Sequence, residues 1–151
     1  MPDVIEIRPA IVTEQKVLEA LQTRASLANP GDREWLLANL DAIEVPAAQI
    51  AAGQVFVAHE SGKIVGFAVI LPRPDGDAEL DALFVEPNIW RQGIGRLLLD
   101  HCADAAKSAG SVALHVVGNP HAERFYVACG FVNVGTVSLR FGEGLLYRKA
   151  L

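Results

Sequence analysis

The sequence predicts one α/β or α+β domain built on a mixed sheet, and three observations support that prediction. Segments with strand spacing alternate with amphipathic helical segments in the order β-α-α-β-β-β-α-β-α-β-β. The chain has 151 residues, enough for one domain to bury roughly two-thirds of its unfolded surface. No internal repeat or low-complexity linker divides it. We therefore assign residues 1–151 to a single domain.

The first fifty residues are predicted to form a strand followed by two helices. Residues 4–8 alternate apolar and polar side chains, which is typical of a strand. Thr13 is the expected N-cap of a helix that runs to about Ala28, and Asp32 is positioned to cap the next helix. The secondary structure of residues 46–53 is ambiguous from the sequence.

Three predicted strands follow, and the last of them leads into a glycine loop. Glu60-Ser61-Gly62 joins the first two as a short hairpin loop. The proline- and glycine-rich residues 72–77 indicate a turn before the third. The three strands are predicted at residues 54–59, 63–71 and 78–85.

The second half of the chain alternates helices and strands. Gly110 and Gly130 each follow a helical segment, as expected of the C′ residue that ends a helix. The last two strands are predicted to turn at Gly142-Glu143-Gly144. The predicted helices are residues 94–109 and 119–128, and the predicted strands are residues 111–117, 131–139 and 140–148.

Composition and charge exclude several classes of protein. The net charge of −5 argues against a dedicated nucleic-acid binder. No apolar run reaches membrane-spanning length and no basic-then-apolar leader opens the chain, so we expect a cytoplasmic protein without a membrane partner. Cys102 and Cys129 lie in apolar helical contexts and are predicted to be buried free thiols. The four histidines lack ligand spacing, so no metal is expected.

Gly93 and Gly95 open a helix directly after a strand, which is an arrangement that binds anions. The first N–H groups of a helix have no carbonyl partner within it, and the helix dipole adds partial positive charge there. Glycines remove the side chains that would keep a diphosphate away from those N–H groups.

Three phosphate-binding loops share this layout. A P-loop requires Gly-Lys-Ser/Thr after a longer glycine loop, and that motif is absent. The dinucleotide fingerprint requires a third glycine where the chain has Leu98, and an acidic residue about twenty positions further on. Arg91-Gln92-Gly93-Ile94-Gly95 instead resembles the acyl-CoA pyrophosphate loop of the GNAT (GCN5-related N-acetyltransferase) superfamily, Arg/Gln-x-x-Gly-x-Gly/Ala. Trp90 occupies the first position of that pattern, which is usually Arg or Gln.

A second motif strengthens the resemblance. Residues 119–131 follow the C-terminal GNAT signature, Asn-x-x-Ala-x-x-Phe-Tyr-x-x-x-Gly-Phe. The resemblance implies a mostly antiparallel sheet of six to seven strands flanked by about four helices. It also implies an acetyl-CoA-dependent N-acetyltransferase that acts by direct attack of an amine in a ternary complex. The matching residues are Asn119, Ala122, Phe125, Tyr126, Gly130 and Phe131.

The same resemblance implies which residues bind the carrier. The main-chain N–H groups of residues 92–96 would hold the diphosphate, and the side chains of Arg91 and Arg96 either add charge or are solvated surface. Asn119 would bind the pantetheine arm, act as a helix N-cap, or both. The remaining carrier-binding residues are Gln92, Gly93, Ile94, Gly95 and Phe125, with the main chain of Leu83, Phe84 and Val85 for the pantetheine amides.

Three side chains are candidates for proton transfer. Glu79 and Asp81 lie two apart on one face of a strand, where a carboxylate could deprotonate the attacking amine. Glu79 is otherwise a surface residue at a strand end, and Asp81 is either the base, an anchor for the amine, or a partnered carboxylate. Tyr126 is at the family's position for protonating the leaving thiolate, and otherwise is an aromatic core residue.

The sequence leaves the acceptor and the assembly open. We favour a primary amine of a small molecule. The alternatives are a protein N-terminus or lysine as acceptor, and a non-catalytic acyl-CoA-binding module. Many relatives dimerise, which is the basis for expecting a homodimer.

Overall fold

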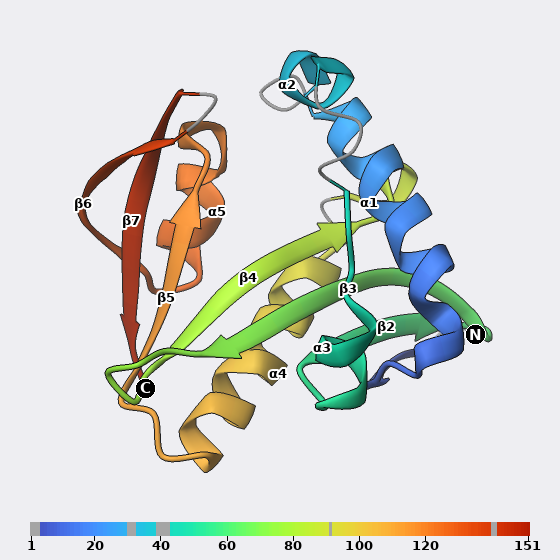
Figure 1. The fold of residues 1–151 in the computed structure, drawn as a ribbon, viewed down its shortest axis with the longest axis horizontal. Helices are drawn as coiled ribbons and strands as arrows, with labels where there is room; N and C mark the ends of the chain where they lie inside the picture. The colour runs from blue at the N-terminus through green and yellow to red at the C-terminus, as the bar shows by residue number, and fades with distance from the viewer. Residues whose placement is uncertain (1–3, 30–32, 39–42, 91, 140–141) are drawn as a thin grey trace. The chain divides into compact units, whose positions relative to one another are not determined.

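The computed structural model describes residues 4–29, 33–38, 43–90, 92–139 and 142–151 (Figure 1). Its seven strands form one sheet in the order β1-β2-β3-β4-β5-β7-β6, and the described residues include five α-helices. β1 with β2, β2 with β3, β5 with β7 and β6 with β7 pair antiparallel, and β4 pairs with β5 in parallel, so the predicted mixed, mostly antiparallel sheet is confirmed. The strands are β1 (Ile5–Pro9), β2 (Val55–Glu60), β3 (Lys63–Pro72), β4 (Ala78–Val85), β5 (Ala113–Gly118), β6 (Val132–Leu139) and β7 (Gly142–Ala150). The helices are α1 (Gln15–Ala28), α2 (Arg33–Ala38), α3 (Ala47–Ala51), α4 (Ile94–Ser108) and α5 (Glu123–Ala128).

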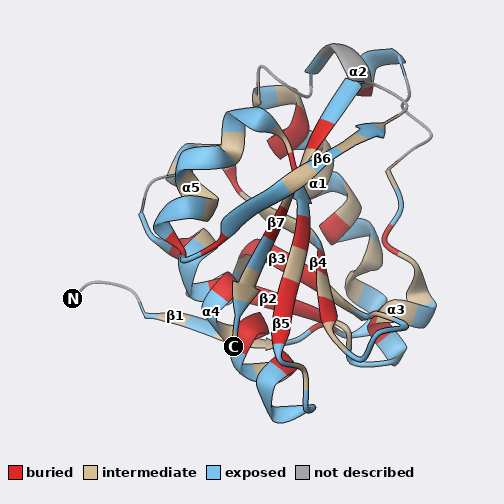
Figure 2. Ribbon diagram, turned by 90° about the vertical axis from the view of Figure 1, so that its left-hand side faces the viewer, coloured by how far each residue is buried: buried red, intermediate tan, exposed pale blue. Residues whose placement is uncertain are grey.

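The chain divides into two compact units, each described by itself below. The first unit comprises Met1–Val69 and Ala82–His101, and the second comprises Ile70–Asp81 and Cys102–Leu151. Figure 2 shows that buried residues gather in β2 and β3 of the first unit and in β5 of the second. No helix in the part of the chain that the structure describes is long and apolar enough to cross a membrane.

The first unit contains the predicted hairpin of β2 and β3. Ser61 and Gly62 both have positive φ, 51° and 79°, as a two-residue hairpin turn requires to match the twist of its strands. The core beneath it includes side chains from both strands and from α1, and α3 forms in the segment that the sequence left open. Buried core residues of this unit include Leu18, Leu21, Val55, Val57 and Phe67.

The start of α1 differs from the prediction, because its N-cap residue is Glu14 and not Thr13, and no side chain donates or accepts a capping hydrogen bond there. A 3₁₀ turn at Val12–Glu14 precedes the helix, and Glu14 Oε1 accepts a hydrogen bond from the N–H of Ile11 at 2.9 Å. The same carboxylate binds Arg8 at 3.0 and 2.7 Å, and this contact lowers the pKa of Glu14. Thr13 therefore lies inside the 3₁₀ turn, and α1 begins two residues later, at Gln15. Asp32, the predicted cap of the second helix, lies outside the described residues.

The second unit contains β5, flanked by the start of β4 and by β7. β5 is parallel to β4, with Glu79 opposite His115, and antiparallel to β7. α5 lies beside β5 and β7 (Figure 1). Gly110 and Gly130 have φ of 97° and 93°, which confirms both as the residues that end their helices.

The predicted turn at Gly142-Glu143-Gly144 is wrong, because these residues belong to β7. Gly142 pairs with Leu139, and Gly144 pairs with Val137. A Cβ atom at Gly144 would lie 2.7 Å from Leu139 Cδ1 and 2.9 Å from Val117 Cγ1. Gly144 is therefore a position of close side-chain packing within the sheet.

Candidate functional site

The predicted anion-binding loop lies at the junction of β4 and α4 in the first unit. Gly93 has φ of +83°, and no atom lies within 4 Å of the position that its Cβ would occupy. Its carbonyl accepts from the N–H of Leu97 at 3.1 Å and so closes the first turn of α4. Gln92 and Gly93 are exposed, whereas Ile94 is 2% exposed and anchors the helix in the core. The helix start is thus accessible while the helix itself is fixed.

The turn that leads from β4 to this loop has three hydrogen-bonded ties. The N–H of Glu86 donates to the carbonyl of Val65 on β3 at 2.8 Å. The Glu86 carboxylate, in a residue 8% exposed, accepts two hydrogen bonds from the half-exposed Arg24 of α1 at 2.9 and 3.0 Å. The indole N–H of Trp90 donates to the carbonyl of Val85 at 2.8 Å. These contacts hold the entrance to the loop in one conformation.

The Arg24–Glu86 pair predicts a positioning effect on carrier binding. Replacing Arg24 by glutamine leaves a nearly buried carboxylate without its guanidinium. We expect the affinity for CoA to fall about threefold to tenfold through lost preorganisation, and the free energy of unfolding to fall by about 1 kcal/mol, a low value because Arg24 is half-exposed. Calorimetry and denaturant titration measure the two effects.

The control for this prediction removes another cation from the same helix. Lys16 is exposed on α1, so Lys16→Gln is expected to change neither quantity. The double variant Arg24→Gln/Glu86→Gln should lose no more affinity than the worse single variant, because the two residues act as one pair. Additive losses would contradict the coupling.

The main-chain edge predicted to bind pantetheine is at the end of β4. Gly66 allows β3 to approach it closely, since a Cβ there would lie 3.0 Å from the carbonyl oxygen of Phe84. Phe84 also packs against Phe67, with ring centroids 5.6 Å apart. The Val85 carbonyl already accepts the Trp90 indole N–H, so it is not a free acceptor for a pantetheine amide. Arg91 lies outside the described residues.

The C-terminal motif lies in the second unit, where Asn119 has the capping role. Its Oδ1 accepts from the N–H of His121 at 2.9 Å and caps the 3₁₀ turn Pro120–Ala122, which leads into α5. The N-cap interpretation of Asn119 is confirmed, and its contact with pantetheine stays a prediction that is compatible with it.

Tyr126 is half-buried among aromatic rings of the second unit. Its ring centroid lies 5.3 Å from that of Phe125, 5.6 Å from that of Phe131 and 5.3 Å from that of Tyr147. Gly118 lies against two of these rings, because a Cβ there would be 2.9 Å from Tyr147 Cε2 and 3.0 Å from Tyr126 Cε2. The aromatic packing of Tyr126 is therefore present, and it fixes the ring whatever its hydroxyl does.

Tyr147 is a residue that sequence reasoning missed. Its side chain is buried, and its hydroxyl has no hydrogen-bond partner among the described residues. Burial, and then the charge of Glu123, raise the pKa of Tyr147. In the sequence Tyr147 is one residue of an alternating strand, and nothing in that pattern indicates that its ring contacts Tyr126 of α5.

The two candidate bases lie on β4 within the second unit. Glu79 is half-buried and Asp81 is exposed. The surrounding protein atoms raise the pKa of Asp81, although its side chain reaches solvent. The Asp81 carboxylate makes no hydrogen bond or ion pair within the described part of the chain, so the structure gives no support to the partnered alternative there. A perturbed, accessible carboxyl is typical of functional sites.

Both cysteines are buried and neither forms a disulfide, as predicted. Burial raises the pKa of the Cys102 thiol to about 12. A thiol with so high a pKa stays protonated at neutral pH and is a poor nucleophile.

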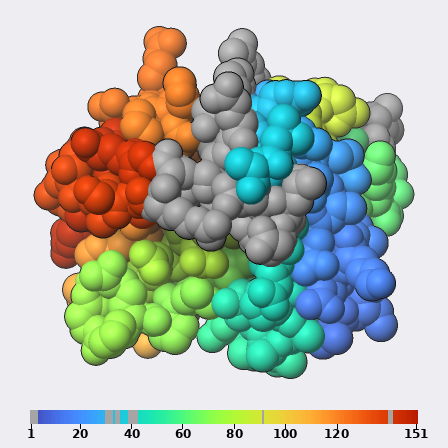
Figure 3. All heavy atoms as spheres, turned by 45° about the horizontal axis from the view of Figure 1, so that its top comes forward, coloured from blue at the N-terminus to red at the C-terminus, as the bar shows by residue number. Residues whose placement is uncertain are grey.

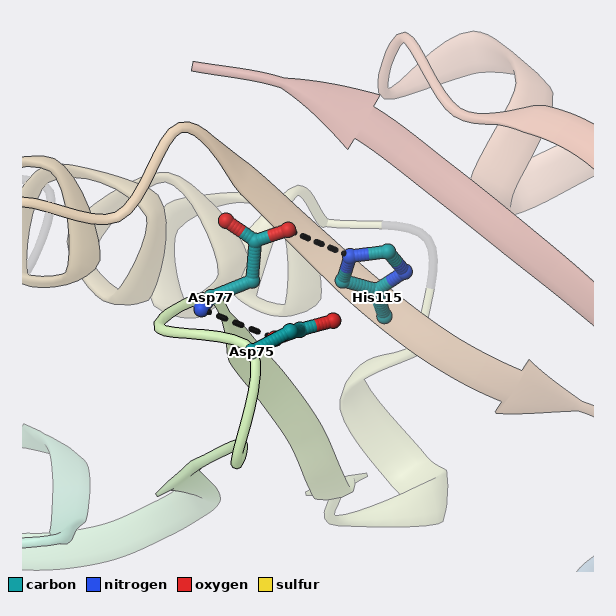
Figure 4. A group of neighbouring side chains, drawn as sticks. All are labelled: Asp75, Asp77 and His115. Carbon is teal, nitrogen blue, oxygen red and sulfur yellow. Dashed lines mark hydrogen bonds and ion pairs between the residues drawn. The ribbon is translucent and has the colours of Figure 1, made fainter.

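Asp75, Asp77 and His115 form a cluster that the spacing of the histidines did not predict (Figure 4). One ligand atom from each lies within 4.8 Å of the others, as a metal site would require. Asp77 already accepts from the N–H groups of Val112 and Ala113 at 3.2 Å, and its other oxygen is 2.9 Å from His115 Nε2. The cluster thus fastens the exposed 73–77 connection, light green at the lower left of Figure 3, to the start of β5.

Asp77 is predicted to contribute pH-dependent stability. Its hydrogen bond with His115, and then those with Val112 and Ala113, lower the pKa of Asp77. A lowered pKa means that the stabilisation is complete above the unfolded-state pKa and is lost as the pH falls through the folded-state pKa. Asp77→Asn should therefore lower Tm by a few degrees at pH 7. The difference from wild type should shrink below about pH 4.

Thermal unfolding monitored by circular dichroism from pH 7 to pH 3 measures this dependence. Asp75→Asn is the comparison variant: the N–H of Asp77 and then Arg73 lower the pKa of Asp75 as well, but among the described residues these partners lie in the same turn, so we expect a smaller pH-dependent loss. If the difference in Tm between Asp77→Asn and wild type is the same at every pH, the charge of Asp77 does not contribute to stability.

The fold is a mixed α/β sheet, and a glycine-containing loop held by hydrogen bonds lies at the start of α4. A sequence model described as "Acetyltransferase (GNAT) family" matches residues 17–131, which include both motifs. The chain therefore belongs to the GNAT family of acetyltransferases.

Relatives and solved structures agree with this assignment. The chain is 30% identical over 91 residues to an uncharacterized N-acetyltransferase of Mycobacterium bovis, and the match spans 58% of each protein. The fold is similar to that of the PaiA N-acetyltransferase from Thermoplasma acidophilum in complex with coenzyme A, with a TM-score of 0.81, 20% identity and coverage of 98% and 99% of the two chains. A GCN5-related N-acetyltransferase from Rhodopseudomonas palustris gives a TM-score of 0.78 at 24% identity, over 100% and 99% of the chains.

Proposed function

We propose that this protein is an acetyl-CoA-dependent N-acetyltransferase that acetylates a primary amine of a small molecule. The observation that carries the proposal is the braced loop at the start of α4, which offers main-chain N–H groups beside Gly93 to a diphosphate. Membership of the GNAT family and the likeness to a protein solved with coenzyme A support the choice of carrier.

The proposed chemistry is direct transfer. Glu79 or Asp81 accepts a proton from the ammonium group of the acceptor, directly or through water, and the neutral amine attacks the thioester carbonyl carbon. The tetrahedral oxyanion collapses, the carbon–sulfur bond breaks, and the thiolate takes a proton from Tyr126. A main-chain N–H of the β4 edge would stabilise the oxyanion.

An acetyl-enzyme intermediate is not part of this proposal. A cysteine nucleophile would have to ionise, and Cys102 is buried with a pKa of about 12. Cys129 is buried as well. Transfer without a covalent intermediate therefore needs both substrates bound together, and kinetics should show intersecting rather than parallel double-reciprocal lines.

Calorimetry with CoA and a thiol-release assay with a panel of amines test the proposal. We expect CoA to bind, and acetyl-CoA to release thiol in the presence of at least one small primary amine. No heat with CoA at millimolar concentration would overturn the proposal. Binding without turnover for any amine would instead support the acyl-CoA-binding module.

The same panel separates the two classes of acceptor. Peptides with free N-termini and peptides with internal lysines are included at equal concentration. A preference for either peptide over every small amine would replace the small-molecule acceptor with a protein. A homodimer and a cytoplasmic location remain predictions from the sequence and the family resemblance.

A further inference from the structure

Trp90 lies where the main-chain edge of β4 meets the glycine loop. Its indole N–H donates to the carbonyl of Val85, the last residue of β4, at 2.8 Å. This bond turns the side chain back over the end of the strand. The residue is nevertheless 40% exposed, so part of the ring system faces solvent. Trp90 is therefore an oriented aromatic surface at the entrance to the loop.

The neighbouring ties give this aromatic surface a fixed base. Glu86 is bound to Val65 through its N–H and to Arg24 through its carboxylate. The contacts of Glu86 hold the start of the turn that follows β4, and the indole hydrogen bond of Trp90 holds its end. An aromatic side chain held in this way loses little further conformational entropy when a ligand covers it.

The order of chemical groups along CoA indicates what would cover the indole, an inference that rests on the proposed function. The amides of the pantetheine arm come first, then the pantoyl group with its two methyl groups, then the diphosphate. If the arm pairs with the β4 edge and the diphosphate binds at the start of α4, the pantoyl group lies at the junction. Trp90 is an exposed apolar side chain at that junction.

We propose that the Trp90 indole is a carrier-binding residue that forms an apolar wall for the pantoyl methyl groups. In this chain it replaces the Arg or Gln that usually begins the loop pattern. The carrier thereby loses a polar contact with an Arg or Gln side chain. It gains burial of its pantoyl methyl groups against the indole, which is worth about 25 cal/mol for each Å² of apolar surface covered. The indole N–H keeps its bond to Val85 while the ring face receives the ligand.

Fluorescence tests the contact directly, because the chain has two tryptophans and Trp35→Phe leaves Trp90 as the only one. Calorimetry first confirms that the Trp35→Phe variant binds CoA with the same affinity as wild type. We expect its emission to shift to the blue as CoA saturates the site. CoA that binds in the calorimeter and leaves the emission unchanged would overturn the inference. No binding by wild type would overturn the proposed function instead.

Three substitutions separate the ring contact from the hydrogen bond and from charge. Trp90→Ala should weaken CoA binding about tenfold, whereas Trp90→Phe, which keeps a ring but loses the N–H, should stay within threefold of wild type. Equal losses in both variants would assign the effect to the Val85 hydrogen bond and overturn the inference. Trp90→Arg that binds as tightly as wild type would also overturn it. Far-ultraviolet circular dichroism and Tm confirm that each variant is folded.

Discussion

Replacing Tyr126 by phenylalanine is expected to lower kcat by about 100-fold and to leave the affinity for acetyl-CoA unchanged. The substitution removes one hydroxyl group and keeps the ring that packs against Phe125, Phe131 and Tyr147. The fold should therefore be preserved. The loss falls on the step in which the thiolate leaves, because that thiolate needs a proton and a phenol still carries its proton at neutral pH. This fall in kcat is at the low end of the range for general acid catalysis, because a thiolate is already a good leaving group.

Tyr147 provides a matched control for this prediction. Tyr147→Phe also removes one hydroxyl from the same aromatic group, but from a buried residue whose hydroxyl has no partner among the described residues. Removing such a group is near neutral or stabilising. We expect kcat within about threefold of wild type and an equal or higher Tm. Steady-state thiol release measures both variants. If Tyr126→Phe retains full turnover, solvent protonates the thiolate.

The parts of the fold that sequence predicted well are those fixed by local chemistry. Gly110 and Gly130 end helices because a residue with positive φ is needed directly after each. Ser61-Gly62 gives the hairpin for a similar reason. These positions depend on neighbours within a few residues, so a single sequence contains the needed information.

The parts that sequence missed depend on partners far along the chain. Arg24 and Glu86 are 62 residues apart, and neither lies in a motif. Asp77 and His115 are 38 residues apart and meet only because β4 and β5 pair in parallel. Thr13 is not the N-cap of α1, and the neighbouring Glu14 carboxylate binds Arg8 on β1 and the N–H of Ile11. Long-range pairing decides such contacts, and local propensity does not encode it.

The candidate site divides along the same line. The glycine loop and the C-terminal motif were found because their residues are contiguous. The hydrogen bond from Trp90 to Val85 was not, although only five positions separate them, because the pattern assigns that position to a polar side chain. The sequence therefore indicated the candidate loop, and the structure supplied the hydrogen bonds that hold it.

Replacing Glu79 by glutamine is expected to lower kcat/KM by about 100-fold, with the greatest loss at low pH. There the acceptor is mostly protonated, and a base is needed to generate the reactive amine. Glutamine has nearly the same volume and cannot accept the proton. Initial rates from pH 5.5 to 9.5 measure the effect. A loss that is equal at every pH would assign Glu79 to substrate positioning instead of proton transfer.

Asp81→Asn distinguishes the second carboxylate by combining activity with stability. Burial raises the pKa of Asp81, so the folded protein binds its proton more tightly than the unfolded chain does. The ionised form therefore costs stability above the folded-state pKa, and that cost disappears as the pH falls below the unfolded-state value. We expect Asp81→Asn to raise Tm at pH 7 while lowering kcat/KM about tenfold. Replacing a residue with a purely structural role would not raise Tm and lower kcat/KM together. Full activity in both Glu79→Gln and Asp81→Asn would leave water as the base and contradict the proposed carboxylate mechanism.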